Sequence, residues 1–151
     1  MIKIGVSDGD KSETTKEFLR KLCAGAPIEI CEPHHPLDVL IINSIPENHC
    51  RALCSSPKVI VANSDDRHVL ELISTISAQI ITYGFNPKAA ITASSRFDDA
   101  FVICIQRAMT TICGKAIFPR EFAVAFDGRG NFDECFLGAA SAALICGVKF
   151  E

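Results

Sequence analysis

The 151-residue sequence has no tryptophan, one tyrosine and no two cysteines spaced as CxxC. It also lacks the basic surplus of a nucleic-acid-binding surface, because 15 Lys and Arg stand against 18 Asp and Glu. The opening residues MIKIGV lack the pattern of a secretory leader, and the longest weakly polar run, at 135–148, is shorter than the roughly 20 residues of a membrane span. We therefore expect a cytoplasmic protein with no nucleic-acid partner and no membrane partner.

Eight cysteines occur in the chain, and without an export signal most are expected to be reduced thiols that pack as small apolar side chains. One alternative is a zinc site. Cys50 and Cys54 are spaced to share a helix face and could combine with His49 and the His34-His35 pair, although this spacing matches no strong template.

A second alternative is a reactive thiol at Cys23 or Cys31. A thiol becomes reactive where basic neighbours lower its pKa, and only Cys50, between His49 and Arg51, has such neighbours. We favour packing over chemistry for the cysteines.

The first half of the chain alternates short β-branched runs with amphipathic helical patterns, which is typical of βα units and a mostly parallel sheet. Their continuous apolar character predicts strands buried on both faces at Ile2–Val6, Ile28–Cys31, Val39–Asn43, Lys58–Ala62 and Gln79–Tyr83. Apolar stripes predict helices at Thr14–Cys23 and Asp66–Ile76, the second capped by Asp65 or Asp66. We predict a single α/β domain over residues 1–151, with a mainly parallel sheet flanked by helices.

The pattern changes after Tyr83, where GFNPK forms a turn cluster and short apolar runs follow. We expect a smaller antiparallel β part here, with a hairpin turn at 113–115 between strands at Met109–Ile112 and Ala116–Phe118. An Ala-rich helix is predicted from Phe132 to Cys146, with Gly147 ending it. Its small residues should let it pack closely against another element.

Residues 5–15, GVSDGDKSETT, join the first strand to the first helix, which is the position of a phosphate-binding loop. Gly5, Lys11 and Ser12 fit the GxxxxGK[ST] spacing, but Asp10 occupies the second glycine position and would place a carboxylate beside the phosphates. The alternative is an acidic turn in which Asp10, Ser12 or a neighbour caps the following helix.

Three stretches, in order, together resemble the central ATP-binding domain of the Mur ligases, which add amino acids to the peptidoglycan precursor. IKIGVSDGDKSETTKEFLRKL is similar to the family pattern IxVTGTNGKTTTxxxLxxxL. The second stretch is DVLIINSIPENH, with KVIVANSDD and IITYGF after it. The third stretch is GRGNFDECFLGAASAALICGV, which is similar to the family pattern GRHNxxNxxAAxAxAxxxG. The resemblance implies a P-loop-like fold, ATP and Mg²⁺ as ligands, and two further ligase domains that do not fit within 151 residues.

Aligned with TGTNGKT, the loop keeps Ser7 for the first threonine but has Asp8 for the first glycine. Lys11 stands in place of the second glycine and Ser12 in place of the lysine. Within this resemblance the cofactor-binding candidates are Gly9, Lys11, Ser12, Thr14 and Asn131. Two added carboxylates and a displaced lysine should repel a polyphosphate rather than bind it.

The resemblance implies Mg²⁺ ligands at a glutamate and a histidine, for which Glu29 and His49 are the best matches. It also implies a carboxylated lysine downstream, but no lysine occurs between His49 and Lys58. In the segment that helps to bind adenine, Asn131 is kept, whereas Gly130 replaces a histidine and Glu134 an asparagine.

These departures affect groups that stabilise charge during phosphoryl transfer, while framework residues are kept better. We therefore predict no catalytic residue and a degenerate, stand-alone domain that binds a protein partner or self-associates. We expect the Ala-rich final helix and the missing domains to leave the surface for this contact. The alternative is an ATP-binding subunit or remnant of an ATP-dependent amide-forming ligase of cell-wall metabolism. Titration of the wild type and of Lys11→Ala with ATP and Mg²⁺ distinguishes the two hypotheses.

Overall fold

The computed structural model describes residues 1–45, 56–126 and 132–150. Its strands are β1 Ile2–Ser7, β2 Ile28–Ile30, β3 Val39–Ile42, β4 Val59–Asn63, β5 Gln79–Tyr83, β6 Ile91–Arg96, β7 Ala100–Ile105, β8 Met109–Thr110, β9 Ala116–Ile117 and β10 Arg120–Ala125. Its helices are the 3-10 turn η1 Gly9–Lys11 and the α-helices α1 Ser12–Leu22, α3 Arg67–Ile73 and α4 Asp133–Ile145. Among the described residues, no helix combines the length and the apolar character needed to cross a bilayer.

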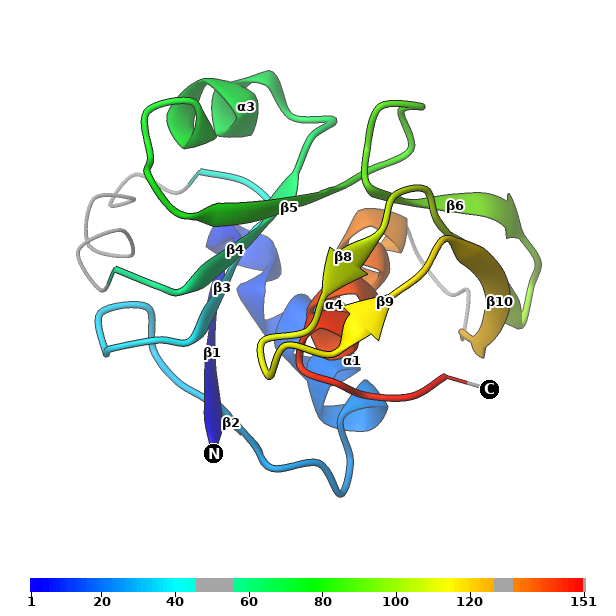
Figure 1. Cartoon of the computed structure of the whole chain (residues 1–151), viewed down its shortest axis with the longest axis horizontal. Helices are drawn as coiled ribbons and strands as arrows, with labels where there is room; N and C mark the ends of the chain where they lie inside the picture. Colours follow the sequence, from blue (N-terminus) through cyan, green and yellow to red (C-terminus); the bar gives the residue numbers. More distant parts are fainter. Residues whose placement is uncertain (46–55, 127–131, 151) are drawn as a thin grey trace.

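Eight strands form one mixed sheet in the order β10-β7-β6-β5-β4-β3-β1-β2 (Figure 1). The six strands from β2 to β6 in this order are parallel, and β7 is antiparallel to both β6 and β10. β8 and β9 pair in a separate two-stranded antiparallel sheet. The predicted α/β class, with a mainly parallel sheet and a smaller antiparallel part after residue 83, is therefore confirmed. β7 and β10 extend the main sheet, whereas the predicted hairpin is the separate pair.

The central strands β3 and β4 are buried along their whole length, because helices cover both faces of the sheet. Alternate side chains point to opposite faces, so Val39 and Ile41 join one core while Leu40 and Ile42 join the other. α3 packs on the second, smaller core. α1 and α4 pack against each other over the larger one.

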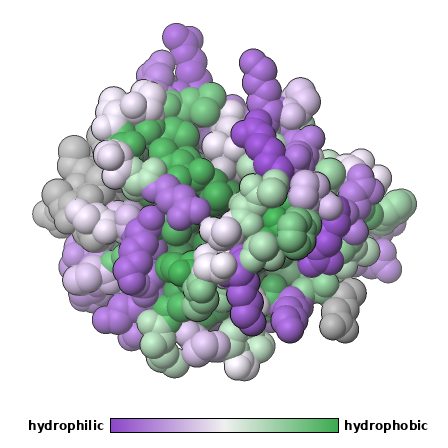
Figure 2. Space-filling view, in the orientation of Figure 1, coloured by the Kyte–Doolittle hydropathy of each residue, from purple (hydrophilic) through white to green (hydrophobic). Residues whose placement is uncertain are grey.

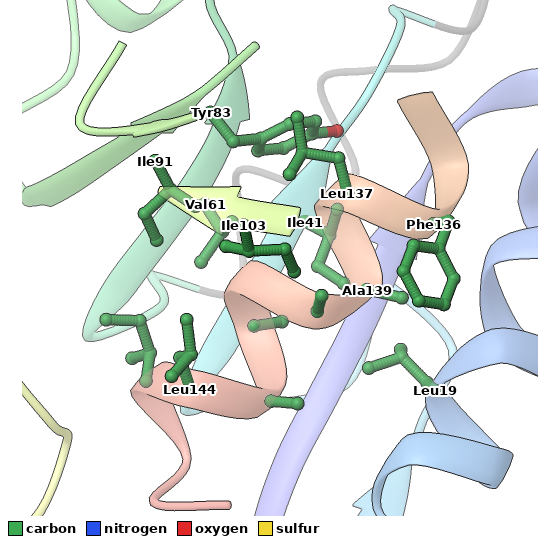
Figure 3. Packing of buried hydrophobic residues seen from close by; sticks show 14 of the residues in the cluster. Leu19, Ile41, Val61, Tyr83, Ile91, Ile103, Phe136, Leu137, Ala139 and Leu144 are labelled. Atoms are coloured by element: carbon green, nitrogen blue, oxygen red, sulfur yellow. The ribbon is translucent and has the colours of Figure 1, made fainter. Parts of the chain in front are cut away.

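α4 is apolar on all sides, and every residue from Cys135 to Ile145 is buried. A helix that is hydrophobic all round must be enclosed rather than laid on a surface. The sheet, α1 and the β8–β9 hairpin enclose it, and the hairpin is joined to its end by the Ile112 N–H, which donates to the Ile145 carbonyl at 2.8 Å (Figure 1). Figure 3 shows Phe136, Leu137, Ala139 and Leu144 of α4 among side chains from the sheet and from α1.

The small residues of α4 allow this close packing, as the sequence predicts. A Cβ added at Gly138 would lie 2.7 Å from the Tyr83 hydroxyl oxygen, so only glycine fits there without a shift of β5 or α4. Phe18 of α1 packs edge-on against Phe136 of α4, with ring centroids 5.3 Å apart. Gly138 thus allows α4 to lie close to Tyr83 of β5.

The second predicted helix begins as expected. Asp66 is the N-cap of α3, and its Oδ1 accepts hydrogen bonds from the backbone N–H groups of His68 and Val69 at 2.8 and 3.2 Å. The helix ends at Ile73, three residues before the predicted end. Turn bonds from Thr75 and Ile76 to the carbonyls of Leu72 and Ile73 follow it.

Candidate functional site

The loop singled out by the sequence lies at the carboxyl end of β1, between Ser7 and the start of α1 at Ser12. Ligands of open parallel sheets bind at this end of the strands. Gly9 has a φ of 52°, in the left-handed region that glycine adopts without strain. The loop therefore occupies the place of a binding site, and its side chains decide whether it is one.

Asp8 directs its side chain inward from this loop, and the residue is only 2% exposed. One carboxyl oxygen, Oδ1, accepts hydrogen bonds at 3.0 Å from Asn43 Nδ2 and from Ser44 Oγ. The other, Oδ2, accepts from Thr15 Oγ1 at 3.0 Å and from Cys135 Sγ at 3.6 Å. The hydrogen bonds to the two oxygens of Asp8 thus come from the residues that follow β3, from α1 and from α4.

The hydrogen bonds continue from Asp8 along the ends of the parallel strands. Asn43 Oδ1 accepts from the Tyr83 hydroxyl at 2.7 Å and from Asn63 Nδ2 at 3.2 Å. Asn63 Oδ1 in turn accepts from the Asp65 backbone N–H at 3.0 Å. Figure 3 shows the Tyr83 ring reaching from its strand toward α4. We call Asp8, Asn43, Asn63 and Tyr83 the polar core, since all four residues are buried and the other three side chains each bond to that of Asn43.

Burial also determines the protonation of these groups. It raises the pKa of Asp8 above the ordinary value of 3.8, and the hydrogen bonds donated to its carboxyl group oppose that rise. Burial raises the pKa of Tyr83 well above its usual value and that of the Cys135 thiol to about 11. Tyr83 and Cys135 therefore keep their protons near neutral pH and act as hydrogen-bond donors in this site.

Lys11, the cation of the loop, is paired. Its ammonium Nζ lies 2.6 Å from Oε1 of Glu134, which is in the first turn of α4. This hydrogen bond raises the pKa of Lys11, which keeps the side chain charged. The positive charge that a phosphate loop would direct at its ligand is here matched by a carboxylate from the other end of the chain.

The predicted cap of the first helix is wrong. The N-cap of α1 is Lys11, and no side chain makes a capping hydrogen bond there. Asp10 lies within η1, one position too early to cap, and Ser12 already has helical backbone angles. The acidic residue that matters in this turn is Asp8, which bonds to a side chain of α1 rather than to its backbone.

The structure brings four predicted cofactor-binding residues into one segment, with Gly9 and Lys11 in η1 and Ser12 and Thr14 in the first turn of α1. Asn131, the fifth, lies outside the described residues, as does the predicted metal ligand His49.

Glu29, the other predicted metal ligand, is exposed on β2, where it pairs in register with Lys3. Four residues separate Lys3 from Ser7 at the end of β1, which corresponds to about 13 Å along a strand. The structure thus does not bring Glu29 to the loop. Within the described ranges, no three His, Cys, Asp or Glu side chains are grouped so that they could hold a metal ion.

The alternative zinc and thiol sites gain no support from the described residues. His34 and His35 lie against each other with ring centroids 4.4 Å apart, and their proposed partners Cys50 and Cys54 lie outside the described ranges. Burial raises the pKa of Cys23 to about 11, and burial also raises that of Cys31. A raised pKa disfavours the thiolate, so neither of these two cysteines has the properties of a reactive thiol.

Sequence analysis does not identify Asn43, Asn63 or Tyr83 as members of the site. A signal was nevertheless present, because each follows or ends an apolar run predicted to be a buried parallel strand. Such strands end at a common edge of the sheet. A polar residue at the end of each strand is therefore a pattern that predicts a buried cluster.

No protein-family model matches this sequence, and no curated protein matches it at a significant level of similarity.

The Lys11–Glu134 pair is expected to contribute little to stability, because its side chains are 46% and 37% exposed. In a double-mutant cycle with Lys11→Met and Glu134→Gln, followed by urea unfolding, we expect a coupling energy of at most about 1 kcal/mol. The coupling should fall further in about 1 M salt because salt screens exposed charges. Arg67→Met and Glu71→Gln, the exposed pair on α3, serve as the matched control. A coupling several times larger would mean that this ion pair is a main determinant of the loop conformation.

Proposed function

We propose that this chain is a non-catalytic domain of the Mur ligase type, which keeps the fold of the ATP-binding domain but not its nucleotide site. It acts by binding a protein partner or a second copy of itself. The observation that carries the proposal is the pairing of Lys11 with Glu134 beside the buried carboxyl group of Asp8.

The substituted positions of the loop and of the α4 segment contact one another in space. Lys11 and Glu134, both departures from the family pattern, form an ion pair, and Asp8 bonds to Cys135, the neighbour of Glu134. A buried carboxyl group or a lone charge costs free energy when it has no partner. Lys11 and Glu134 are each other's partner and Asp8 is bonded on both oxygens, so each substituted group has a partner, which is expected of a site converted to a structural role.

A triphosphate would have to undo these contacts to bind. It would compete with Glu134 for the Lys11 ammonium, and its charge would lie near the Asp8 carboxyl group. Like charges within about 4 Å of each other repel strongly where water is excluded. The Thr15 hydroxyl and the Asn43 side-chain amide also already donate hydrogen bonds to Asp8. The geometry therefore supports a loss of phosphate binding.

The prediction that the Ala-rich final helix leaves a surface for this contact is wrong. The Ala-rich helix α4 offers none, because it is buried along nearly its whole length. Large apolar side chains that are exposed come from other elements: Leu70, Phe85, Phe97 and Phe118 are 42%, 47%, 57% and 69% exposed. These four side chains come from separate segments, and they are the described large exposed apolar groups, apart from Met1, that a protein contact could use. Sedimentation velocity distinguishes a second copy, seen as concentration-dependent association, from a different protein partner.

Titration calorimetry with MgATP tests the loss of the nucleotide site. We expect no saturable heat at millimolar nucleotide, and the same result for Lys11→Ala, because the buried Asp8 carboxyl group engages the Thr15 and Asn43 donors whether or not Lys11 is present. Saturable micromolar binding that disappears in Lys11→Ala would contradict the proposal. That outcome would favour instead an ATP-binding subunit of an amide-forming ligase of cell-wall metabolism.

A further inference from the structure

A pocket of about 390 Å³ lies at the far end of α4 from the loop, where the β8–β9 hairpin, the end of α4 and the residues after it meet. Its volume is within the range of pockets that bind small organic molecules. Figure 2 shows apolar residues at the surface over the β8–β9 hairpin, with hydrophilic residues beside them. Neither the polar core nor the Lys11–Glu134 pair contributes to this pocket.

The walls of the pocket are apolar and come from three separate segments. Ile117 of β9, Leu144 of α4 and Val148 after α4 line it, and the 69% exposed Phe118 ring also lines it. Leu144 is buried and Ile117 and Val148 are partly buried, and these apolar side chains beside an exposed aromatic ring favour a ligand with a hydrocarbon or aromatic body.

The charged groups of the pocket are all positive. Lys115, Arg120 and Lys149 line it, and no Asp or Glu is among its described lining residues, although the whole chain carries a net charge of -3. The Arg120 guanidinium carbon lies 4.6 Å from the centroid of the Phe122 ring, a cation–π contact that holds this side chain in place. The concentration of cations against the overall charge favours an anionic ligand.

We propose that this pocket binds a small carboxylate with an apolar chain, of the medium-chain fatty-acid class. The chain lies against Ile117, Leu144 and Val148, and the carboxylate is held by the cations of the hairpin and of the residues after α4. This binding site is independent of the proposed loss of nucleotide binding at the loop.

Titration calorimetry with butanoate, hexanoate and octanoate tests the proposal. We expect saturable binding whose affinity rises by up to about fourfold for each added methylene, the upper limit set by full burial of the chain. Amide shifts in NMR spectra should change at 111–118 and 144–149. The double variant Lys115→Gln/Lys149→Gln should bind octanoate at least tenfold more weakly, while Lys21→Gln/Lys88→Gln, which removes two exposed lysines elsewhere, should bind as the wild type does.

Three outcomes would overturn the proposal. They are no saturable binding of octanoate, equal binding of octyltrimethylammonium, or amide shifts confined to other parts of the chain. Vesicles containing phosphatidylglycerol test a different ligand of the same cations, because an exposed Phe118 with lysines nearby is also suited to an anionic lipid surface. Sedimentation with these vesicles in the absence of octanoate binding would mean that the patch is a membrane contact and not a pocket for a free ligand.

Discussion

Replacing Asp8 with alanine is expected to lower the free energy of unfolding by about 3 kcal/mol. The substitution removes the acceptor for Asn43 Nδ2 and for the Thr15 and Ser44 hydroxyls, in a site where Asp8 itself is 2% exposed. A buried donor without an acceptor costs about 1–3 kcal/mol, and the two hydroxyls can rotate to recover part of that cost. Urea unfolding followed by circular dichroism measures the change, since the chain has no tryptophan for fluorescence.

Asp8→Asn is the matched control, because it keeps the shape and one acceptor oxygen. Its amide group can donate to Thr15 Oγ1 in place of accepting from it. We expect a loss of at most about 1 kcal/mol. If Asp8→Ala were as stable as Asp8→Asn, the hydrogen bonds to Asp8 would not be a structural requirement and the polar core would lose its proposed role.

The same pair of proteins gives a pH prediction. Because burial raises the folded-state pKa of Asp8 above 3.8, the native state binds this proton more tightly than the unfolded chain does. The stability that the group contributes is fully present below 3.8 and is lost as the pH rises through its folded-state pKa. The unfolding free energy of the wild type, relative to that of Asp8→Asn, should therefore fall as the pH rises above about 4 and through the folded-state pKa of Asp8. A rise over this range would mean that the hydrogen bonds outweigh burial and lower the pKa.

Gly138→Ala is expected to lower the free energy of unfolding by about 2 kcal/mol, although alanine normally stabilises a helix interior by about 1 kcal/mol relative to glycine. The added Cβ would lie 2.7 Å from the Tyr83 hydroxyl oxygen and 2.8 Å from the ring carbon Cζ. Tyr83 cannot move away freely, because its hydroxyl donates to Asn43 Oδ1 at 2.7 Å. Thermal and urea unfolding measure the change.

Combining Gly138→Ala with Tyr83→Phe should reduce the clash, since the nearest contacting atom is then absent. The loss in the double variant should be smaller than the sum of the two single losses, which shows as a coupling energy in a double-mutant cycle. Glu17→Ala and Glu17→Gly, at an exposed position in the middle of α1, report the propensity difference between alanine and glycine separately. A Gly138→Ala variant more stable than the wild type would show that α4 does not approach β5 as closely as described.

The arrangement of the main strands could be predicted because the pattern that specifies it is local. The strands Val39–Ile42 and Val59–Asn63 are apolar throughout except for the terminal Asn63, and such apolar runs between helical patterns predict parallel strands with both faces covered. The C-terminal end of α3 could not be predicted as well, since Leu72 and Ile76 continue an apolar stripe while the helix ends at Ile73. After Ile73 the backbone makes tighter turn bonds, from Thr75 to Leu72 and from Ile76 to Ile73, and the stripe does not encode this change.

The candidate site was predicted less well, because its chemistry depends on contacts between distant parts of the chain. Asp8 and Lys11 are conspicuous in the sequence, but Glu134, which pairs with Lys11, is 123 residues away. Repulsion of phosphate by the acids at positions 8 and 10 was the expected effect. In the structure, Asp8 is buried and bonded while Asp10 is exposed, so the proposed loss of phosphate binding rests on the contacts of Asp8 rather than on repulsion by both acids. Sequence alone cannot place two such distant side chains against each other.

The most direct test of the central claim is a set of amide NMR spectra recorded while MgATP is added to the wild-type protein. The claim is that the loop between β1 and α1 is part of a structural polar core and does not bind triphosphate. We expect the amide chemical shifts of Gly9, Lys11 and Ser12 to remain unchanged at millimolar nucleotide. Saturable shifts of these three signals, absent in Lys11→Ala, would contradict it.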